Sequence, residues 1–289
     1  MLVHLSELIK DAKKKNYALG AFNIENLETT IGVVRAAVKM KSPVILQVSE
    51  TSIQYAGLKA ITSIVQAIAA VEAGDIPVSL HLDHGKSFRS VAECVRAGFS
   101  SIMMDASDMP FTENIILTKQ AVDFAHRKGV FAQGELGIVK GLEEVSPEER
   151  KKMMTNAEEA EEFVSKAGVD TLAVAVGNVH GIIKMQKGNP GLDLKRLESI
   201  HKIIPDTPLV LHGASGMSGQ QIKDGIKYGI TIINTDTELR LAFTQTLRHT
   251  LENNPDIYDP REVMTPSIEA IQKVTEEKME FLGSAGMVK

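Results

Sequence analysis

Three histidines, each followed directly by a glycine, stand at the ends of short apolar runs that are typical of buried strands. They are His84, His180 and His212. Glycine lets the backbone turn tightly and approach a ligand closely. Three imidazoles with an open fourth position are typical of a catalytic zinc site, whereas a structural site fills all four positions. The alternative for any one of them is a histidine that only closes its strand through hydrogen bonds.

Carboxylates occupy similar positions in neighbouring runs. Asp83 directly precedes His84, Asp105 ends the run SIMMD, and Glu135 lies near the end of VFAQGEL. His81 is two residues before Asp83 and so shares its face of the strand, which favours a structural role for this histidine. The sequence therefore predicts a cluster of imidazoles and carboxylates, provided that the fold brings these strand ends together.

Two further segments predict a phosphate site. The residues from His212 to Gly216 read HGASG, and those from Asn234 to Thr237 read NTDT at the start of a helical segment. Both supply small residues, hydroxyls and backbone N–H groups, and the dipole of a helix N-terminus favours an anion. A GASG turn alone is a weak signal because such turns are common. The two segments together carry the prediction.

The elements that must position these residues alternate along the chain. Eight apolar runs predict strands at 17–23, 43–49, 77–83, 101–105, 130–136, 171–177, 208–213 and 231–234. Helical periodicity between them predicts helices that include 27–40, 58–73, 91–98, 113–128, 157–167 and 194–203. Repeated βα units imply a parallel sheet, either a closed (β/α)₈ barrel or an open doubly wound sheet.

The first strand–helix junction favours the closed barrel. An open dinucleotide-binding sheet would carry G-x-G-x-x-G there, but the junction reads AFNIENLE and contains no glycine. In a (β/α)₈ barrel the active site lies at the C-terminal strand ends, and the loops after strands seven and eight often bind phosphate. The fold prediction and the predicted site therefore agree.

We expect one barrel domain over 1–289, with 254–289 as a C-terminal helical extension. A helix is expected from 236 to about 253 and another over 268–282, and the three prolines within 252–266 predict an irregular surface crossing between them. The longest irregular stretch, 137–155, follows a barrel strand, and long loops at that position are commonly functional.

Composition excludes several classes of protein. The chain of 289 residues has 32 basic and 37 acidic side chains, a net charge of -5, and no long run of one sign, which argues against a nucleic-acid or membrane partner. The N-terminal segment lacks the apolar region of a signal peptide, so we expect a cytoplasmic protein. Cys94 is the only cysteine, which excludes a disulfide framework and a thiolate zinc site.

In their order and spacing, these motifs resemble the class II, metal-dependent fructose-bisphosphate aldolases, in the shorter branch that also holds tagatose-bisphosphate aldolases. The likeness covers essentially the whole chain. It rests on YALGAFNIENLE, SPVILQVSE, LHLDHGKSF, GFSSIMMDASDMPF, ELG, AVAVGNVHG, LVLHGASG, INTDTELRLAF, YDPREVMTP and EKMEFLGSAG. The resemblance implies a (β/α)₈ barrel and, as in dimeric and tetrameric relatives, a homodimer or homotetramer.

Carried over by position, the resemblance makes His84, His180 and His212 the ligands of a catalytic Zn²⁺. Asp83 would protonate the aldehyde oxygen in the condensation direction, and Glu143, in the long loop, would take the proton from the nucleophilic carbon. The residues expected to hold the substrate are Gly181, Gly213, Ser215, Asn234, Asp236 and Thr237 around dihydroxyacetone phosphate, and Ser49 near the aldehyde portion. Lys184 lies in a loop as a solvated or phosphate-facing group.

Arg240 is four residues after Asp236, so the two share a helix face. The simpler interpretation is an exposed ion pair of small energetic value. The resemblance suggests instead that Arg240 meets the far phosphate of the sugar. A planar guanidinium can bind a phosphate in bidentate fashion, which a lysine cannot reproduce.

Two carboxylates and two departures from the family pattern concern the surroundings of this site. Asp105 and Glu135 match candidate positions for a second divalent ion, or a monovalent cation, although backbone or lysine partners would equally account for them. Relatives often read DGSHLPF where this chain has Asp108 in place of the histidine. Their loop G-G-x-E-D begins here with Lys140. These departures bear on loop movement and substrate choice.

The expected chemistry follows from the charge that carbon–carbon cleavage creates. Breaking C3–C4 of a ketose phosphate leaves negative charge on the C2 oxygen, and no lysine lies within the eight predicted strands to form a Schiff base. A metal ion acting as a Lewis acid is therefore expected. Fructose 1,6-bisphosphate is the expected substrate; tagatose 1,6-bisphosphate, a deoxy-ketogluconate phosphate and a sulfo-sugar phosphate stay open. The rival hypotheses are a metal-dependent barrel hydrolase and a non-catalytic phosphosugar-binding subunit.

Overall fold

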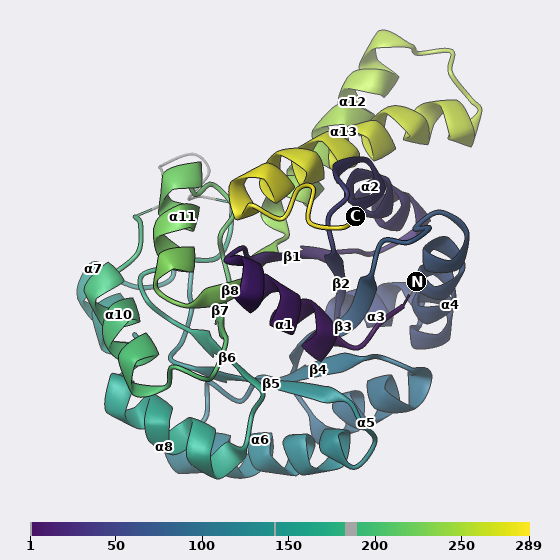
Figure 1. Ribbon diagram of the computed structural model, residues 1–289. Coiled ribbons are helices and arrows are strands. Elements are labelled where there is room, and N and C mark those ends of the chain that lie inside the picture. Colours follow the sequence, from purple (N-terminus) through teal and green to yellow (C-terminus); the bar gives the residue numbers. More distant parts are fainter. Residues whose placement is uncertain (1, 142, 183–189) are drawn as a thin grey trace.

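The eight predicted strands form a closed parallel barrel (Figure 1). The computed structural model describes residues 2–141, 143–182 and 190–289. The strands are β1 (Leu19–Asn23), β2 (Val44–Ser49), β3 (Val78–Gly85), β4 (Ser101–Met104), β5 (Phe131–Leu136), β6 (Thr171–Val174), β7 (Leu209–Leu211) and β8 (Ile230–Thr235). β1 pairs with both β2 and β8, which closes the sheet. The (β/α)₈ prediction is confirmed.

Helices on the outside of the barrel alternate with the strands. They are α2 (Leu27–Met40), α4 (Leu58–Val71), α5 (Phe88–Ala97), α6 (Phe111–His126), α8 (Ala157–Ala167), α10 (Leu194–Ile203), α11 (Gly219–Lys227) and α12 (Thr237–Asn253), with the short α3 (Glu50–Ala56) and α7 (Pro147–Lys152). α2, α8 and α10 have the bounds that periodicity predicts. None of the helices among the described residues has the length and apolarity that crossing a membrane requires.

Local sequence explains where these helices begin and end. In α2, the Asn26 side chain accepts a hydrogen bond from the Thr29 N–H, and the Thr29 side chain is bonded to the backbone at Asn26 in return. Such a capping box satisfies N–H groups that have no partner within the helix. α2 ends where Lys41 adopts a left-handed conformation with φ 47°. These signals determine where α2 begins and ends, and therefore how much chain is left for β1 and β2 on either side of it.

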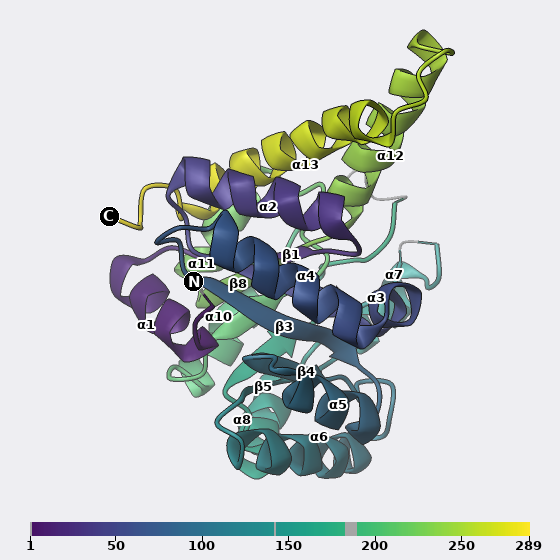
Figure 2. The same cartoon turned by 90° about the vertical axis from the view of Figure 1, so that its right-hand side faces the viewer.

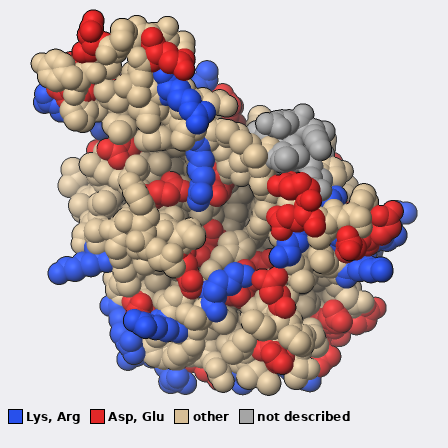
Figure 3. Space-filling view, turned by 180° about the vertical axis from the view of Figure 1, so that it is seen from behind, with Lys and Arg blue, Asp and Glu red and all other residues tan. Residues whose placement is uncertain are grey.

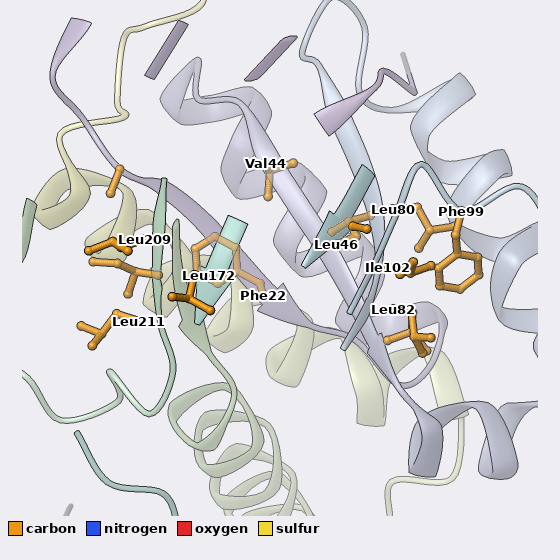
Figure 4. Close-up of a cluster of buried hydrophobic side chains, with 14 of the residues drawn as sticks. Phe22, Val44, Leu46, Leu80, Leu82, Phe99, Ile102, Leu172, Leu209 and Leu211 are labelled. Carbon is orange, nitrogen blue, oxygen red and sulfur yellow. The ribbon is translucent and has the colours of Figure 1, made fainter. Parts of the chain in front are cut away.

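The main core lies between the strands and the surrounding helices. Figure 4 shows part of it, with side chains from β1, β2, β3, β6 and β7. Phe22, Leu46 and Leu172 are completely buried there. Strands buried on both faces read as nearly continuous apolar runs, which is why the eight segments are recognisable in the sequence.

The N-terminal end of the barrel is closed by α1 (Leu5–Lys15), which crosses it in Figure 1. Leu5, Leu8 and Ile9 are buried and form a second apolar cluster with residues on the barrel strands, including Ile45 and Ile232. The helices predicted from the sequence do not include α1. Its effect is to cover one end of the barrel, so the opposite end is the one that remains open.

The C-terminal helix is longer than the sequence suggests. α13 (Pro260–Leu282) packs on α2 and α12, and with the far end of α12 it projects from the barrel (Figure 2). The predicted irregular crossing up to 266 is therefore wrong from Pro260 onward. Pro260 is the first helical residue, where a missing N–H has no intrahelical partner to lose. The Asp259 side chain caps this start by accepting from the Arg261 N–H, and Pro266 lies inside the helix.

Candidate active site

A cavity of about 600 Å³ opens at the C-terminal ends of the strands. Figure 3 shows this hollowed face, with acidic and basic side chains around the opening. The predicted site residues that line the cavity are Ser49, Asp83, His84, His180, Gly181, His212, Gly213, Ser215, Asn234, Asp236, Thr237 and Arg240. Residues from the ends of β2, β3, β6, β7 and β8 and from α12 thus meet in one space.

The three histidines come together at this cavity. One ring nitrogen from each of His84, His180 and His212 lies within 4.8 Å of the others. His84 Nε2 and His212 Nδ1 are 2.9 Å apart. His84 also adopts a left-handed backbone conformation with φ 47°, which is uncommon for a residue other than glycine. Three facing nitrogen lone pairs are a donor set that fits a divalent transition metal such as Zn²⁺.

Asp105 sets the orientation of His84. The distance between His84 Nδ1 and Asp105 Oδ2 is 2.7 Å. When Nδ1 carries the proton and donates it to Asp105, the lone pair on Nε2 is left to face the other two histidines. Metal-ligating histidines commonly have such a carboxylate partner on the second nitrogen. The carboxylate thus favours the tautomer that a ligand needs.

Glu135 lies beneath the same cluster and is almost completely buried. Its Oε2 has no hydrogen-bond partner among the described residues and is 3.6 Å from His84 Nδ1. His84, Asp105 and Glu135 form a second group of atoms within 4.8 Å of one another. A cation bound there through His84 Nδ1 would replace the hydrogen bond to Asp105. Nδ1 of a neutral imidazole cannot both donate a proton to Asp105 and offer a lone pair to a cation. His84 can therefore take part in only one of these two arrangements at a time.

Burial and neighbouring charges shift the pKa values of the ionisable groups here: they oppose each other at His84 and act together at His212 and Glu135. Burial lowers the pKa of His84, but Asp83, Asp105 and Glu135 outweigh it and raise that pKa to about 10. Burial and the neighbouring His84 hold the pKa of His212 well below its usual value. Burial, followed by the charge of Asp105, raises the pKa of Glu135 to about 8. The cluster therefore concentrates positive charge on one imidazole when no metal is bound.

Asp83 is held by two amides. Asn23 Nδ2 donates to Asp83 Oδ2 at 2.9 Å, and Asn234 Nδ2 donates to Oδ1 at 3.4 Å. Gln47 in turn donates to Asn23 Oδ1 at 2.5 Å. Burial acts to raise the pKa of Asp83, but His84, His212 and the Asn23 amide lower it further than burial raises it. A fixed, ionised carboxylate thus stands beside His84.

Asn23 and Gln47 also line the cavity, but neither residue is predicted from the sequence. The available signal is an amide within an otherwise apolar strand, since a buried amide needs hydrogen-bond partners. That signal indicates a polar contact but not what the partner is. Gln133 is a similar case, because its amide lies 3.2 Å from His212 Nε2.

The predicted phosphate residues form a concave surface between the β7 loop and the start of α12. A Cβ on Gly213 would collide with the carbonyl oxygen of Val179, so the close approach of these loops requires glycine. Asp236 precedes the first residue of α12, but its side chain makes no capping hydrogen bond to the helix. The first N–H groups of α12 therefore lack an Asp236 cap, and a helix N-terminus of this kind attracts an anion.

Glu143 lies at the rim and is exposed. Its Oε1 would be 3.5 Å from a Cβ on Gly181, and the His180 N–H donates to the carbonyl oxygen of Lys140 at 3.1 Å. The loop that bears Glu143 is thus attached beside His180. Glu143 is not among the residues that line the cavity, and Lys184 lies outside the described residues.

The two departures from the family pattern contact each other. Lys140 Nζ is 3.5 Å from Asp108 Oδ1, and Lys86 Nζ is 3.4 Å from Asp108 Oδ2. Lys86 also contacts Asp105 at 2.7 Å. The unusual aspartate and the unusual lysine therefore form an ion pair that joins the loop after β4 to the loop that bears Glu143.

Arg240 forms the predicted ion pair with Asp236 and also lies where it can contact a substrate in the cavity. Its Nε donates to Asp236 Oδ1 at 2.5 Å, and its Nη2 is 3.2 Å from Glu25 Oε1. Half of its side chain is exposed, and it lines the cavity. Burial raises the pKa of Glu25 to about 7 against the opposing charge of Arg240. Two carboxylates thus hold a guanidinium at the edge of the site.

The family model described as fructose-bisphosphate aldolase class-II matches residues 3–287. The chain belongs to the class II fructose-bisphosphate aldolases. The family consists of lyases that act on phosphorylated sugars and are generally metal-dependent. This membership agrees with the group of histidines and carboxylates at the open end of the barrel.

Its relatives include aldolases with different names. The chain is 43% identical over 308 residues to a fructose-bisphosphate aldolase of Thermus caldophilus, with 99% of each chain covered. It is 41% identical over 285 residues to the 6-phospho-5-dehydro-2-deoxy-D-gluconate aldolase of Bacillus subtilis (strain 168), covering 98% of this chain and 96% of that one. Among solved structures, the YdjI aldolase from Escherichia coli K12 matches with a TM-score of 0.84 and 33% identity over 100% of both chains. Overall identity does not separate these substrates.

Proposed function

We propose that this protein is a Zn²⁺-dependent aldolase that cleaves fructose 1,6-bisphosphate to dihydroxyacetone phosphate and an aldehyde. The observation that carries the proposal is the convergence of three imidazole nitrogens within 4.8 Å of one another, beside the buried carboxylate of Asp83. In this proposal His84, His180 and His212 hold the ion. Bound Zn²⁺ would supply a Lewis acid that polarises the ketose carbonyl.

Asp83 and Glu143 divide the proton transfers. In cleavage Asp83 takes the proton from the C4 hydroxyl while the C3–C4 bond breaks, and the electron pair of that bond passes to the C2–C3 portion. Glu143 then delivers a proton to C3. The two amides on Asp83 support the first role because they hold a general base in one orientation.

The two ends of the substrate would contact different residues of the cavity lining. We assign one phosphate to Gly181, Gly213, Ser215, Asn234 and Thr237, where the N-terminus of α12 favours an anion. The proposed phosphate-facing role of Lys184 rests on the sequence alone. Ser49 and Arg240 would meet the aldehyde portion, and the guanidinium supports a second anionic group there. This second group is the reason to prefer a bisphosphate.

Metal analysis tests the central proposal. His84→Ala, His180→Ala and His212→Ala should each lose activity and Zn²⁺ content, because each removes one of three ligands. A chelator should inactivate the unchanged protein, and added Zn²⁺ should restore it. His126→Ala, at an exposed histidine outside the site, is the control. Full Zn²⁺ occupancy with normal turnover in any of the three variants would refute the site.

A substrate panel tests the sugar. The purified protein should release triose phosphate from fructose 1,6-bisphosphate with a higher kcat/KM than from tagatose 1,6-bisphosphate, a sulfo-sugar phosphate or 6-phospho-5-dehydro-2-deoxy-D-gluconate. The last compound is included because a relative at 41% identity is named for it. A higher kcat/KM for another ketose would contradict the proposed substrate but leave the proposed aldolase activity standing. Metal binding without cleavage of any member of the panel would favour the hydrolase or the non-catalytic binding subunit.

A further inference from the structure

A buried ion pair lies behind the proposed phosphate site and joins two helices. Lys278 Nζ on α13 is 2.6 Å from Glu238 Oε2 and 2.8 Å from Glu238 Oε1 on α12. The two side chains are only 9% and 12% exposed. A pair so shielded from water is screened little by salt, and loss of one partner leaves a buried charge uncompensated.

The same glutamate holds the loop after β7. The Gly216 N–H donates to Glu238 Oε1 at 2.6 Å. Gly216 has a φ of 79°. It directly follows Ser215, which is buried and lines the cavity. A charge-assisted hydrogen bond to a backbone N–H is among the stronger contacts a loop can have. Glu238 therefore ties the proposed phosphate loop to the first turn of α12.

The charge of Glu238 needs a counter-ion at this position. A lone carboxylate beside a phosphate site would repel the phosphate dianion, since charges interact strongly where water is excluded. Lys278 compensates that charge without occupying the cavity, because Lys278 is not among the residues that line it. Its ammonium also lies 5.8 Å from the centre of the Phe281 ring on its own helix.

We propose that Lys278 is a positioning residue for phosphate recognition, acting through Glu238 on the Gly216 N–H. It fixes the loop that bears Ser215 and cancels a negative charge that would oppose the anion. The inference rests on the proposed function, because it requires a phosphate group in this loop. It gives α13, which follows the eight βα units, a part in substrate binding.

Lys278→Met tests the proposal with a side chain of similar length and no charge. We expect the KM for the ketose phosphate to rise about tenfold, and inorganic phosphate to inhibit competitively with a Ki raised by a similar factor, while kcat changes little. Metal content should be unchanged. Lys273→Met, at an exposed lysine of the same helix, is the matched control and should leave both constants as they are.

Two further variants separate positioning from general destabilisation. Lys278→Arg keeps the charge and should retain most of the phosphate affinity. In Glu238→Gln combined with Lys278→Met, the glutamine oxygen can still accept from Gly216 and no charge is left unpaired. This double variant should bind phosphate better than Lys278→Met alone.

The outcomes are distinguishable. Equal phosphate affinity in Lys278→Met and the unchanged protein, or a double variant as weak as Lys278→Met, would overturn the role of Lys278. Absence of competition by inorganic phosphate in the unchanged protein would instead overturn the proposed phosphate site, and the inference with it. Thermal unfolding of each variant, measured alongside, shows whether a loss of affinity follows from a loss of fold.

Discussion

Asp83 and Glu143 differ in their surroundings, and this difference separates their proposed roles. Asp83 is buried beside His84 and held by two amides, whereas Glu143 is exposed on a loop at the rim. We expect Glu143→Ala to bind the ketose but lose exchange of the dihydroxyacetone phosphate C1 proton with solvent by about a hundredfold or more. Asp83→Ala should keep that exchange and lose cleavage. Proton exchange by NMR and a coupled cleavage assay measure the two steps.

The control for this pair is Glu148→Ala, at an exposed glutamate of α7, which should alter neither step. An equal loss of exchange and cleavage in both Asp83→Ala and Glu143→Ala, with metal content intact, would contradict the division of roles. It would indicate instead that both carboxylates act on one proton transfer.

Arg240 provides a residue-level test of the second anionic group. Removal of a charge-assisted contact costs about 1.5 to 3 kcal/mol, so Arg240→Ala should lower kcat/KM for the preferred ketose about ten- to a hundredfold. Arg240→Lys should recover only part of this loss, because an ammonium cannot bind phosphate in bidentate fashion. Metal content and affinity for dihydroxyacetone phosphate should stay the same. An unchanged kcat/KM would leave Arg240 as an ion-pair partner of Asp236 and Glu25.

For individual residues, the sequence predicts which side chains gather at the open end of the barrel, but it does not predict all of their hydrogen-bond partners. Polar residues at strand ends are recognisable because the strands before them are apolar, and a barrel brings such ends to one rim. The structure places His84, His180 and His212 together, while their metal-binding role stays a prediction. Asn23 is not predicted from the sequence, because its role depends on a contact with Asp83, which lies 60 residues away along the chain.

Among the elements, α1 has a structural role that is open to direct measurement. Leu8 is 4% exposed and packs in the apolar cluster that closes the N-terminal end of the barrel. Leu8→Ala should lower the free energy of unfolding by about 2 to 5 kcal/mol, because it removes apolar contacts and leaves a cavity. Denaturant titration measures the change.

Lys14→Ala, at an exposed residue of α1, should change stability by less than about 0.5 kcal/mol. The site lies at the opposite end of the barrel, so kcat of Leu8→Ala should be close to that of the unchanged protein well below its melting temperature. A stability loss as small as that of Lys14→Ala would mean that α1 does not close the barrel in solution.

The elements also show where sequence patterns stop being informative. Strand positions follow from local apolar composition, and all eight are found where expected. The start of α13 depends on whether prolines occupy permitted helix positions, and Pro260 does so at the first one. α1 has apolar residues at helical spacing, but spacing alone does not indicate that the surface it covers is the end of the barrel.

For the whole molecule, the predicted (β/α)₈ barrel is confirmed. The prediction of a single domain over 1–289 and that of a homodimer or homotetramer stay predictions. Sedimentation of the full chain would address the assembly. The net charge of -5 is modest, so we expect individual buried carboxylates to affect the pH dependence of stability more clearly than the overall charge does.

Glu25 is the carboxylate for which this pH dependence can be worked out. Burial, and to a lesser extent Asp236, raise its pKa from 4.5 to about 7, against the opposing effect of Arg240. A raised pKa means that the folded state favours the protonated form. The stability that Glu25 contributes is therefore complete below about pH 4.5 and is lost as the pH rises through 7.

Glu25→Gln cannot ionise, so it should escape this loss. We expect the stability of the variant relative to the unchanged protein to increase between pH 4.5 and 8 by roughly 3 kcal/mol, and then to level off. Denaturant unfolding of both proteins across this range measures the difference, which removes the contribution of groups that titrate in both. Glu269→Gln, at an exposed residue of α13, should show a nearly constant difference. If Glu25→Gln gives an equally constant difference, the pKa of Glu25 in the folded state is close to its unfolded value, and the charge of Arg240 offsets the effect of burial.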